Sequence, residues 1–168
     1  MYIFDKSFRK SPRNYIKQSL LALLVVAIIL IFLRLLQGFV VTAAALGAST
    51  FIVFAMPNSI TAEPRRLIGG HVVGLLSGAV CFFAFLNGRP EVMFLNSDYT
   101  FILAGALSVG LSIFLMTITN TEHPPAATTA LGIAANGWSF QTALIVLIAA
   151  LGLTIARRFL RPHLRDLF

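Results

Sequence analysis

The sequence predicts an all-α fold, a polytopic membrane helical bundle with about five to six membrane segments. Of its 168 residues, 58% are hydrophobic and only 11% are charged, and the mean hydropathy is +0.88. Such a composition leaves too few charges to cover the surface of a soluble domain. The apolar residues also form several uncharged stretches long enough to cross a bilayer as helices. The 13 basic residues collect at the two ends and in single loops, which fits membrane topology better than nucleic-acid binding.

Residues 1–17 form a basic leader with apolar and aromatic residues between its cations. This pattern suits the anionic cytoplasmic face of a membrane, either as an ordinary positive flank or as a dedicated lipid site. The leader is not expected to be a cleavable signal, because its cations extend too far and no small-residue cleavage site follows. The uncharged stretch from Gln18 to Leu33, ended by Arg34, is the first predicted span.

Residues 35–62 are uncharged over more than one membrane thickness, so a turn is expected near Gln37 and a helix end at Pro57. The small residues between these points favour close packing of this second segment against other helices. Pro64 marks the start of the third segment, whose span is residues 67–88 and whose glycines again suit packing. The fourth predicted span is residues 100–119.

Residues 124–156 contain no charge and would be about 50 Å long as one helix, against a membrane core of about 30 Å. The break is expected at 136–139, which leaves a short helix from Pro124 to about Ala135 and a full span from Phe140. A short crossing is preferred to a re-entrant segment, because it places the C-terminal arginines on the same side as the basic leader. Both termini are then cytoplasmic, in a multi-pass protein of the cell inner (plasma) membrane.

The predicted organisation is therefore a leader at 1–17, a transmembrane domain at 18–160 and a basic cytoplasmic tail at 161–168. An internal two-unit repeat is a further candidate feature. An offset of 60 residues aligns two units that each read as a small-residue span, a polar loop, a helix-starting proline and a Gly- or Ala-rich span. The identical pairs are Phe54 and Phe114, Met56 and Met116, Thr61 and Thr121, and Pro64 and Pro124.

The stretch 120–132, NTEHPPAATTALG, concentrates polar groups between two apolar segments. Pro124 and Pro125 suit a first helical turn, where a missing N–H costs nothing. The positive end of the helix dipole then lies beside the hydroxyls of Thr128 and Thr129, an arrangement that favours an anion. The alternative is an ordinary helix start whose threonines cap neighbouring backbone.

His71 and His123 are the histidines expected near the membrane, since His163 lies in the basic tail. A metal site is not expected, because the one cysteine, Cys81, sits in an apolar run and the acidic residues are isolated. No cofactor is expected either. A proton-linked role suits imidazole, whose pKa lies near physiological pH. For His71, a hydrogen bond between two helices is an equally good interpretation.

Several short motifs occur in a specific order and membrane context from about Gln18 onward. In these motifs the chain resembles the HPP family of integral membrane proteins, which are described as having four or more spans. Similarity to the cyanobacterial and chloroplast members implies nitrite transport. The motifs are Gly47-Ala48-Ser49, Pro57-Asn58-Ser59, Glu63-Pro64-Arg65, Gly69-Gly70-His71, His123-Pro124-Pro125 and the Ala- and Thr-rich run from Ala126 to Leu131.

The chain departs from the family pattern at two places. Some relatives carry a C-terminal CBS module, whereas this sequence ends at Phe168, so nucleotide control through such a module is not expected. Arg66 also stands where the family often has an asparagine or another polar residue, which bears on the choice of substrate.

We therefore expect a transporter or channel for a small anion, with nitrite as the expected ion and the helix start at the His-Pro-Pro motif in its path. The alternative is a structural or assembly subunit without a substrate. An enzyme is not expected, since no catalytic or phosphate-binding motif occurs. The expected partners are the anion, membrane lipid and a second copy of the chain in a homodimer or other homo-oligomer, and not nucleic acid. The candidate anion-binding residues are Asn58, Ser59, Arg65, Arg66, His71, Asn120, Thr121, His123, Pro124, Pro125, Ala126, Thr128 and Thr129.

Overall fold

The computed structural model describes residues 10–34, 40–86 and 97–168, and within these ranges it contains helices and no strand, as predicted. Two single-turn 3₁₀ helices accompany six α-helices. The elements are α2 (Pro12–Arg34), α3 (Val40–Ala55), η1 (Ile60–Ala62), α4 (Pro64–Phe85), α5 (Ser97–Thr119), α6 (Pro125–Asn136), α7 (Phe140–Leu160) and η2 (Arg161–His163).

The helix boundaries follow the local sequence signals. Pro64 and Pro125 each stand in the first turn of a helix, where the absent N–H would have had no intrahelical partner. The predicted break at 136–139 is confirmed: Gly137 has φ of 91°, a conformation that glycine adopts without strain, and the Ser139 hydroxyl caps α7 by accepting from the N–H of Thr142. Helix α2, which contains the first predicted span, begins at Pro12 rather than at Gln18, so part of the predicted leader is helical. Residues 1–9 and the predicted turn at Gln37 lie outside the described residues.

In the described part of the chain, four helical segments are long and apolar enough to cross a membrane. The other two helices are shorter, since α3 has 16 residues and α6 has 12. At about 1.5 Å per residue they measure roughly 24 Å and 18 Å, less than the hydrocarbon core. The predicted six segments are thus four full-length helices and two short ones. The four long segments are Pro12–Ile31, Pro64–Phe85, Tyr99–Thr119 and Phe140–His163.

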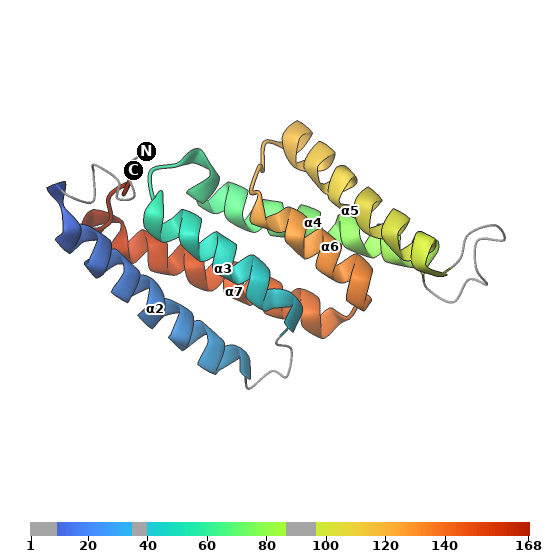
Figure 1. The fold of residues 1–168 in the computed structure, drawn as a ribbon, viewed down its shortest axis with the longest axis horizontal. Coiled ribbons are helices and arrows are strands. Elements are labelled where there is room, and N and C mark those ends of the chain that lie inside the picture. Colours follow the sequence, from blue (N-terminus) through green and yellow to red (C-terminus); the bar gives the residue numbers. More distant parts are fainter. Residues whose placement is uncertain (1–9, 35–39, 87–96) are drawn as a thin grey trace.

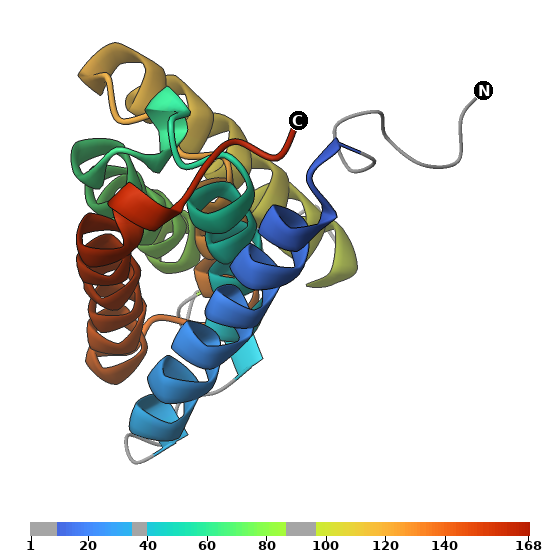
Figure 2. The same cartoon turned by 90° about the vertical axis from the view of Figure 1, so that its left-hand side faces the viewer.

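Successive helices run in alternating directions, with α2 and α5 on opposite flanks of α3, α4, α6 and α7 (Figure 1; Figure 2 shows the turned view). Helix α6 runs parallel to α4, because Gly70 lies beside Ala126, Gly78 beside Ala130 and Phe82 beside Gly137. Helix α6 therefore leads from the end of the bundle where α5 ends toward the opposite end, where α7 begins. This path agrees with the predicted short crossing and not with a re-entrant segment.

The start of α2 and the C-terminal segment lie at the same end of the bundle. The Gln18 side chain donates to the carbonyls of Phe54 (2.6 Å) and Arg165 (2.8 Å) and accepts from the N–H of Arg165. The Tyr15 hydroxyl donates to the Leu167 carbonyl, and Leu164 is buried. Residues 161–168 are thus packed against α2 and α3. That this end faces the cytoplasm stays a prediction.

Two apolar clusters fill the interior of the part of the chain that the structure describes. The larger one joins α2, α3, α4, α7 and the C-terminal segment, and the smaller one joins α4, α6 and α7. The outward faces of α2 and α5 expose many large apolar side chains, as expected for helices in contact with lipid. The larger cluster comprises Ile29, Leu46, Val53, Phe54, Leu67, Ile145, Ala149, Ala150, Leu153 and Leu164; the smaller one comprises Leu75, Ile133, Ala143 and Val146.

The contact between α4 and α6 depends on three glycines spaced one turn apart on α4. A Cβ atom on Gly70 would stand 2.6 Å from Cβ of His123, and one on Gly78 would stand 2.6 Å from the Ala130 carbonyl oxygen. A Cβ on Gly74 would approach the Ala126 carbonyl even more closely. The two backbones therefore approach each other as in small-residue helix contacts of membrane proteins.

Helix α3 runs in the same direction as α5, and α4 runs in the same direction as α6. The loop between α3 and α4 and the loop between α5 and α6 lie at the same end of the bundle (Figure 1). A parallel repeat with an offset of 60 residues requires this arrangement. Thr61 and Thr121 occupy the two corresponding loops, and Pro64 and Pro124 stand at or just before the following helices. The internal repeat itself stays a prediction.

Candidate functional site

The interior of the bundle contains a continuous series of hydrogen bonds, which we call the histidine network. It consists of Thr129 on α6, His71 on α4, Ser49 on α3, His123 in the loop before α6, and the carbonyl of Thr61 in η1. The four contributing side chains are between 0% and 3% exposed. Polar groups in a membrane interior that bond to one another in this way mark a specific site or a fixed helix packing.

The distances in the histidine network are those of ordinary hydrogen bonds. Thr129 Oγ1 lies 2.9 Å from His71 Nδ1, and Ser49 Oγ lies 3.1 Å from His71 Nε2 and 2.9 Å from His123 Nε2. His123 Nδ1 lies 2.9 Å from the Thr61 carbonyl oxygen. The centroids of the two rings are 5.2 Å apart, and the rings meet edge to face. Ser49 thus bridges the two imidazoles.

The carbonyl at one end fixes the direction of every bond when both imidazoles are neutral. A carbonyl oxygen only accepts, so Nδ1 of His123 carries the proton and its Nε2 accepts from the Ser49 hydroxyl. Ser49 has then used its only hydrogen and accepts from Nε2–H of His71. The remaining nitrogen of His71, Nδ1, accepts from the Thr129 hydroxyl. The network is a directed series from Thr129 to Thr61.

Burial of His123 lowers the pKa of its imidazole, and the hydrogen bond to the Thr61 carbonyl partly opposes this shift. This direction of the pKa shift favours the neutral imidazole that the directed series requires. Within the described residues, no group of three or more histidine, cysteine or acidic side chains is placed to hold a metal ion.

Two cavities adjoin the histidine network. One of about 10 Å³ touches Ser49 and His71 and has room for about one water molecule. The other, of about 300 Å³, lies between α5 and α6 and has His123 and Glu122 in its wall. The second cavity is mostly apolar and large enough for a small ion. It is open at the bundle surface, where Ile113 of α5 is exposed, and the His123 side chain, which is 0% exposed, lies at its inner wall.

The start of α6 offers few free backbone donors. Pro124 and Pro125 have no N–H, and the N–H groups of Ala126 and Ala127 donate to the carbonyls of His123 and Pro124. What remains at this helix end is the dipole and the side chains that surround it. The helix start thus acts through the side chains of the histidine network rather than through free N–H groups.

A second set of polar side chains holds the loop before α6 against α4. The guanidinium of Arg66 pairs with the carboxylate of Glu122, and it also donates to the side-chain oxygen of Asn120. Glu63 lies 3.9 Å from the same guanidinium. Asn120 has φ of 56°, a left-handed conformation that asparagine tolerates better than most residues. Arg66 is therefore neutralised by carboxylates and not a free cation.

The other predicted site residues divide between this loop region and the surface. Thr121 packs against Gly69 and shares a hydrogen bond with Thr119, while Arg65 is exposed and donates to the Thr119 carbonyl. Thr128 is exposed, in contrast to its buried neighbour Thr129. Asn58 bonds the carboxylate of Asp166, and Ser59 caps η1. Pro125 and Ala126 are buried, Ala126 lies against α4, and Pro124 is exposed.

Sequence reasoning missed Ser49 and Thr61 as members of the site. Ser49 lies in a small-residue run that indicated only helix packing. A signal was nevertheless available, because Ser49 precedes the end of α3 by about two turns and His71 follows the start of α4 by about two turns. Two antiparallel helices joined by a short connection bring such positions to the same depth.

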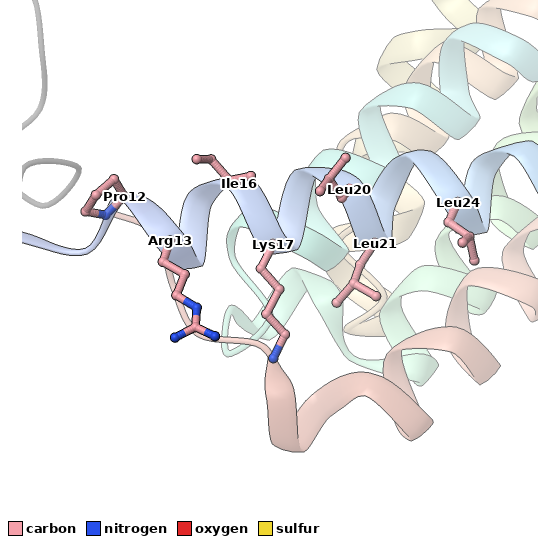
Figure 3. A pocket seen from close by; sticks show the side chains of 7 residues that line it. All are labelled: Pro12, Arg13, Ile16, Lys17, Leu20, Leu21 and Leu24. Carbon is pink, nitrogen blue, oxygen red and sulfur yellow. The ribbon is translucent and has the colours of Figure 1, made fainter.

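A cavity of about 620 Å³ lies on the outer side of α2 and contains none of the predicted site residues. Figure 3 shows Arg13 and Lys17 pointing to one side of the helix, while the rest of the lining is apolar. A surface with cations at one end and apolar side chains below them has the character of a lipid-facing groove. It is separate from the histidine network.

A bundle of apolar helices with a buried polar network defines a multi-pass integral membrane protein. Residues 7–161 match the family model described as HPP, transmembrane region, and the chain belongs to this family. Two transmembrane proteins of Dictyostelium discoideum are also similar, with 38% identity over 91 residues and 30% identity over 115 residues. These matches cover 54% and 67% of the chain, which spans only 29% and 33% of the two relatives. No solved structure matches significantly.

Proposed function

We propose that this protein is a membrane transporter or channel for a small anion, with nitrite as the expected ion. Membership of the HPP family favours a role in membrane transport in general. The observation that carries the proposal is the buried histidine network, which has the 300 Å³ cavity at its His123 end. Buried ionisable groups in a membrane interior are costly and mark substrate paths more often than they mark simple packing.

The chemistry of the network suits a weakly held, singly charged ion. Nitrite is small and planar, so a few N–H and O–H donors can replace its water shell. Ser49, Thr129 and the two imidazoles can provide such donors once they release one another. Because Arg66 is already paired with Glu122, the site avoids a permanent ion pair that would hold the anion too tightly for release.

The alternative is a structural or assembly subunit. It is favoured by one feature, namely that every bond of the histidine network is satisfied within the protein. Under this alternative the network would only fix α3, α4 and α6 relative to one another. The two functions differ in one measurable quantity, the flux of an anion.

Two kinds of partner accompany the proposal. The groove along α2, with Arg13 and Lys17 at its polar end, fits membrane lipid with an anionic headgroup. The apolar face of α5 and the modest size of the bundle fit a homo-oligomer, most simply a dimer. We also propose that both termini face the cytoplasm, on the basis of the distribution of basic residues.

The purified protein in liposomes tests the proposed function. We expect nitrite to enter protein-containing vesicles at least about tenfold faster than protein-free vesicles, which also measure the uncatalysed passage of nitrous acid. Nitrate and formate added in excess should compete, because a dipole and a few hydroxyls discriminate weakly among small anions. Nitrite entry equal to that of protein-free vesicles would contradict transport and favour the structural alternative.

A further inference from the structure

We propose that the histidine network is a proton relay, and that the protein moves one proton together with each nitrite ion. The proposal rests on the anion transport proposed above and deepens it. Its basis is geometric: two imidazoles joined by one hydroxyl form an unbroken directed series of hydrogen bonds, with no gap for water to bridge. Such a series passes a proton by short hops between neighbouring atoms.

The proton transfer can be written atom by atom. A proton binds Nδ1 of His71, the proton on its Nε2 passes to Ser49 Oγ, and the original Ser49 hydroxyl proton passes to Nε2 of His123. One N–H bond and one O–H bond break, and three new bonds to hydrogen form, one of them from the incoming proton. His71 ends neutral with its proton on Nδ1, Ser49 is again a hydroxyl, and His123 is an imidazolium. One positive charge has moved from His71 to His123.

The charge balance of the site supports this coupling. An anion near His123 needs a positive partner in an apolar environment, and Arg66 is already occupied by Glu122. A protonated His123 supplies that partner only while the anion is present, since a nearby negative charge favours the imidazolium. A nitrite ion in the 300 Å³ cavity and a proton on His123 would form a neutral pair.

The charged groups around the network do not supply the same partner. Glu63 and Arg66 stand at the start of α4, Glu122 lies in the loop before α6, and Arg157 of α7 donates to the Pro57 carbonyl. The described side chains of α3 and α6 include no titratable group, and Tyr99 lies at the opposite end of α5. Among these groups, the two imidazoles are the ones that are neutral in the directed series and can accept a proton.

Coupling also removes an energetic obstacle. An anion entering a negative interior is opposed by about 2.3 kcal/mol per 100 mV, whereas a proton and a nitrite ion that move together carry no net charge. The wild-type nitrite flux should therefore respond to an imposed pH gradient and not to an imposed membrane potential. Both conditions can be set in liposomes, with a potassium gradient and valinomycin fixing the potential.

The test compares Ser49→Ala with Ser108→Ala. Both serines are 0% exposed, but Ser49 joins the two imidazoles, whereas Ser108 only donates to the Gly105 carbonyl within α5. With a trapped pH dye and a chemical nitrite assay, we expect Ser49→Ala to lower nitrite-dependent proton entry at least tenfold. Ser108→Ala should stay within about twofold of wild type. Any nitrite flux that remains in Ser49→Ala should respond to the membrane potential.

Nitrogen-15 NMR of the labelled histidines provides a readout without transport. At pH 7, His71 should be protonated on Nε2 and His123 on Nδ1, and Ser49→Ala should shift both signals but not that of His163. Wild-type nitrite flux driven by the potential and indifferent to the pH gradient would overturn the relay and leave anion transport standing. Absence of any nitrite flux would overturn the proposed function, and the coupled step with it.

Discussion

Replacing Gly74 by alanine is expected to disrupt the bundle, lowering its stability by about 3 kcal/mol or more, the upper range for overpacking of a well-packed interior. The added Cβ would stand closer than 3.0 Å to the carbonyl oxygen of Ala126, and real Cβ atoms essentially never approach another atom so closely. The neighbour is backbone on α6, so no side-chain rotation relieves the contact. The gain of up to about 1 kcal/mol in helix propensity on replacing glycine by alanine does not offset it.

The measurement is the midpoint temperature of thermal unfolding of the detergent-solubilised protein, monitored as loss of the folded peak in size-exclusion chromatography. Gly110→Ala is the matched control, because Gly110 lies inside α5 and its Cβ would meet nothing within 4 Å. This control should keep or slightly raise the midpoint. A Gly74→Ala protein as stable as the Gly110→Ala protein would show that α4 and α6 do not pack through this glycine.

Replacing Arg66 by glutamine is expected to destabilise the loop that carries His123. The change leaves Glu122 without its ion-pair partner and removes the donor to Asn120. Breaking a fully buried ion pair costs about 3–5 kcal/mol, but the Glu122 side chain is 40% exposed, so we expect a smaller loss of about 1–2 kcal/mol. The double variant Arg66→Gln with Glu122→Gln should recover part of this loss, since no unpaired charge remains.

A double-mutant cycle of unfolding free energies in mild detergent measures the interaction between the two side chains. Arg65→Gln serves as the control, because Arg65 is exposed and makes one hydrogen bond to the Thr119 carbonyl. The single variants are Arg66→Gln and Glu122→Gln. If their losses of unfolding free energy add up to the loss of the double variant, Arg66 and Glu122 do not interact in the folded protein.

The sequence was sufficient to predict most of the fold. Long uncharged stretches indicated the spans, and Pro64, Pro125 and Gly137 are residues whose backbone restrictions place helix starts and breaks. The sequence predicts less clearly the residue at which a helix starts. Helix α2 begins at Pro12, ahead of the predicted span, because the charged side chains of Arg13 and Lys17 do not interrupt a helix.

The candidate site was predictable only in part. His71, His123 and Thr129 stood out as polar residues in apolar surroundings, and the structure brings these three together. The pairing of Arg66 with Glu122 could not be deduced, because it depends on how the loop before α6 folds over α4. The Thr61 carbonyl was missed because a backbone oxygen has no sequence pattern, whereas Ser49 was missed because its small-residue run was interpreted as helix packing and its depth relative to His71 was not compared.

The two adjacent threonines of α6 provide the most direct test of the account. Thr129 is fully buried and bonds His71, whereas Thr128 is exposed, so the same change to valine removes one hydroxyl inside the histidine network and one outside it. Loss of a buried hydrogen-bond partner costs about 1–3 kcal/mol.

We therefore expect Thr129→Val to lower nitrite flux in liposomes about tenfold, which corresponds to about 1.4 kcal/mol, and Thr128→Val to stay within about twofold of wild type. Both proteins should elute from size-exclusion chromatography like the wild type. Equal nitrite flux from the two correctly folded variants, whether both retain the wild-type rate or both lose it, would contradict the claim that the histidine network is the transport site.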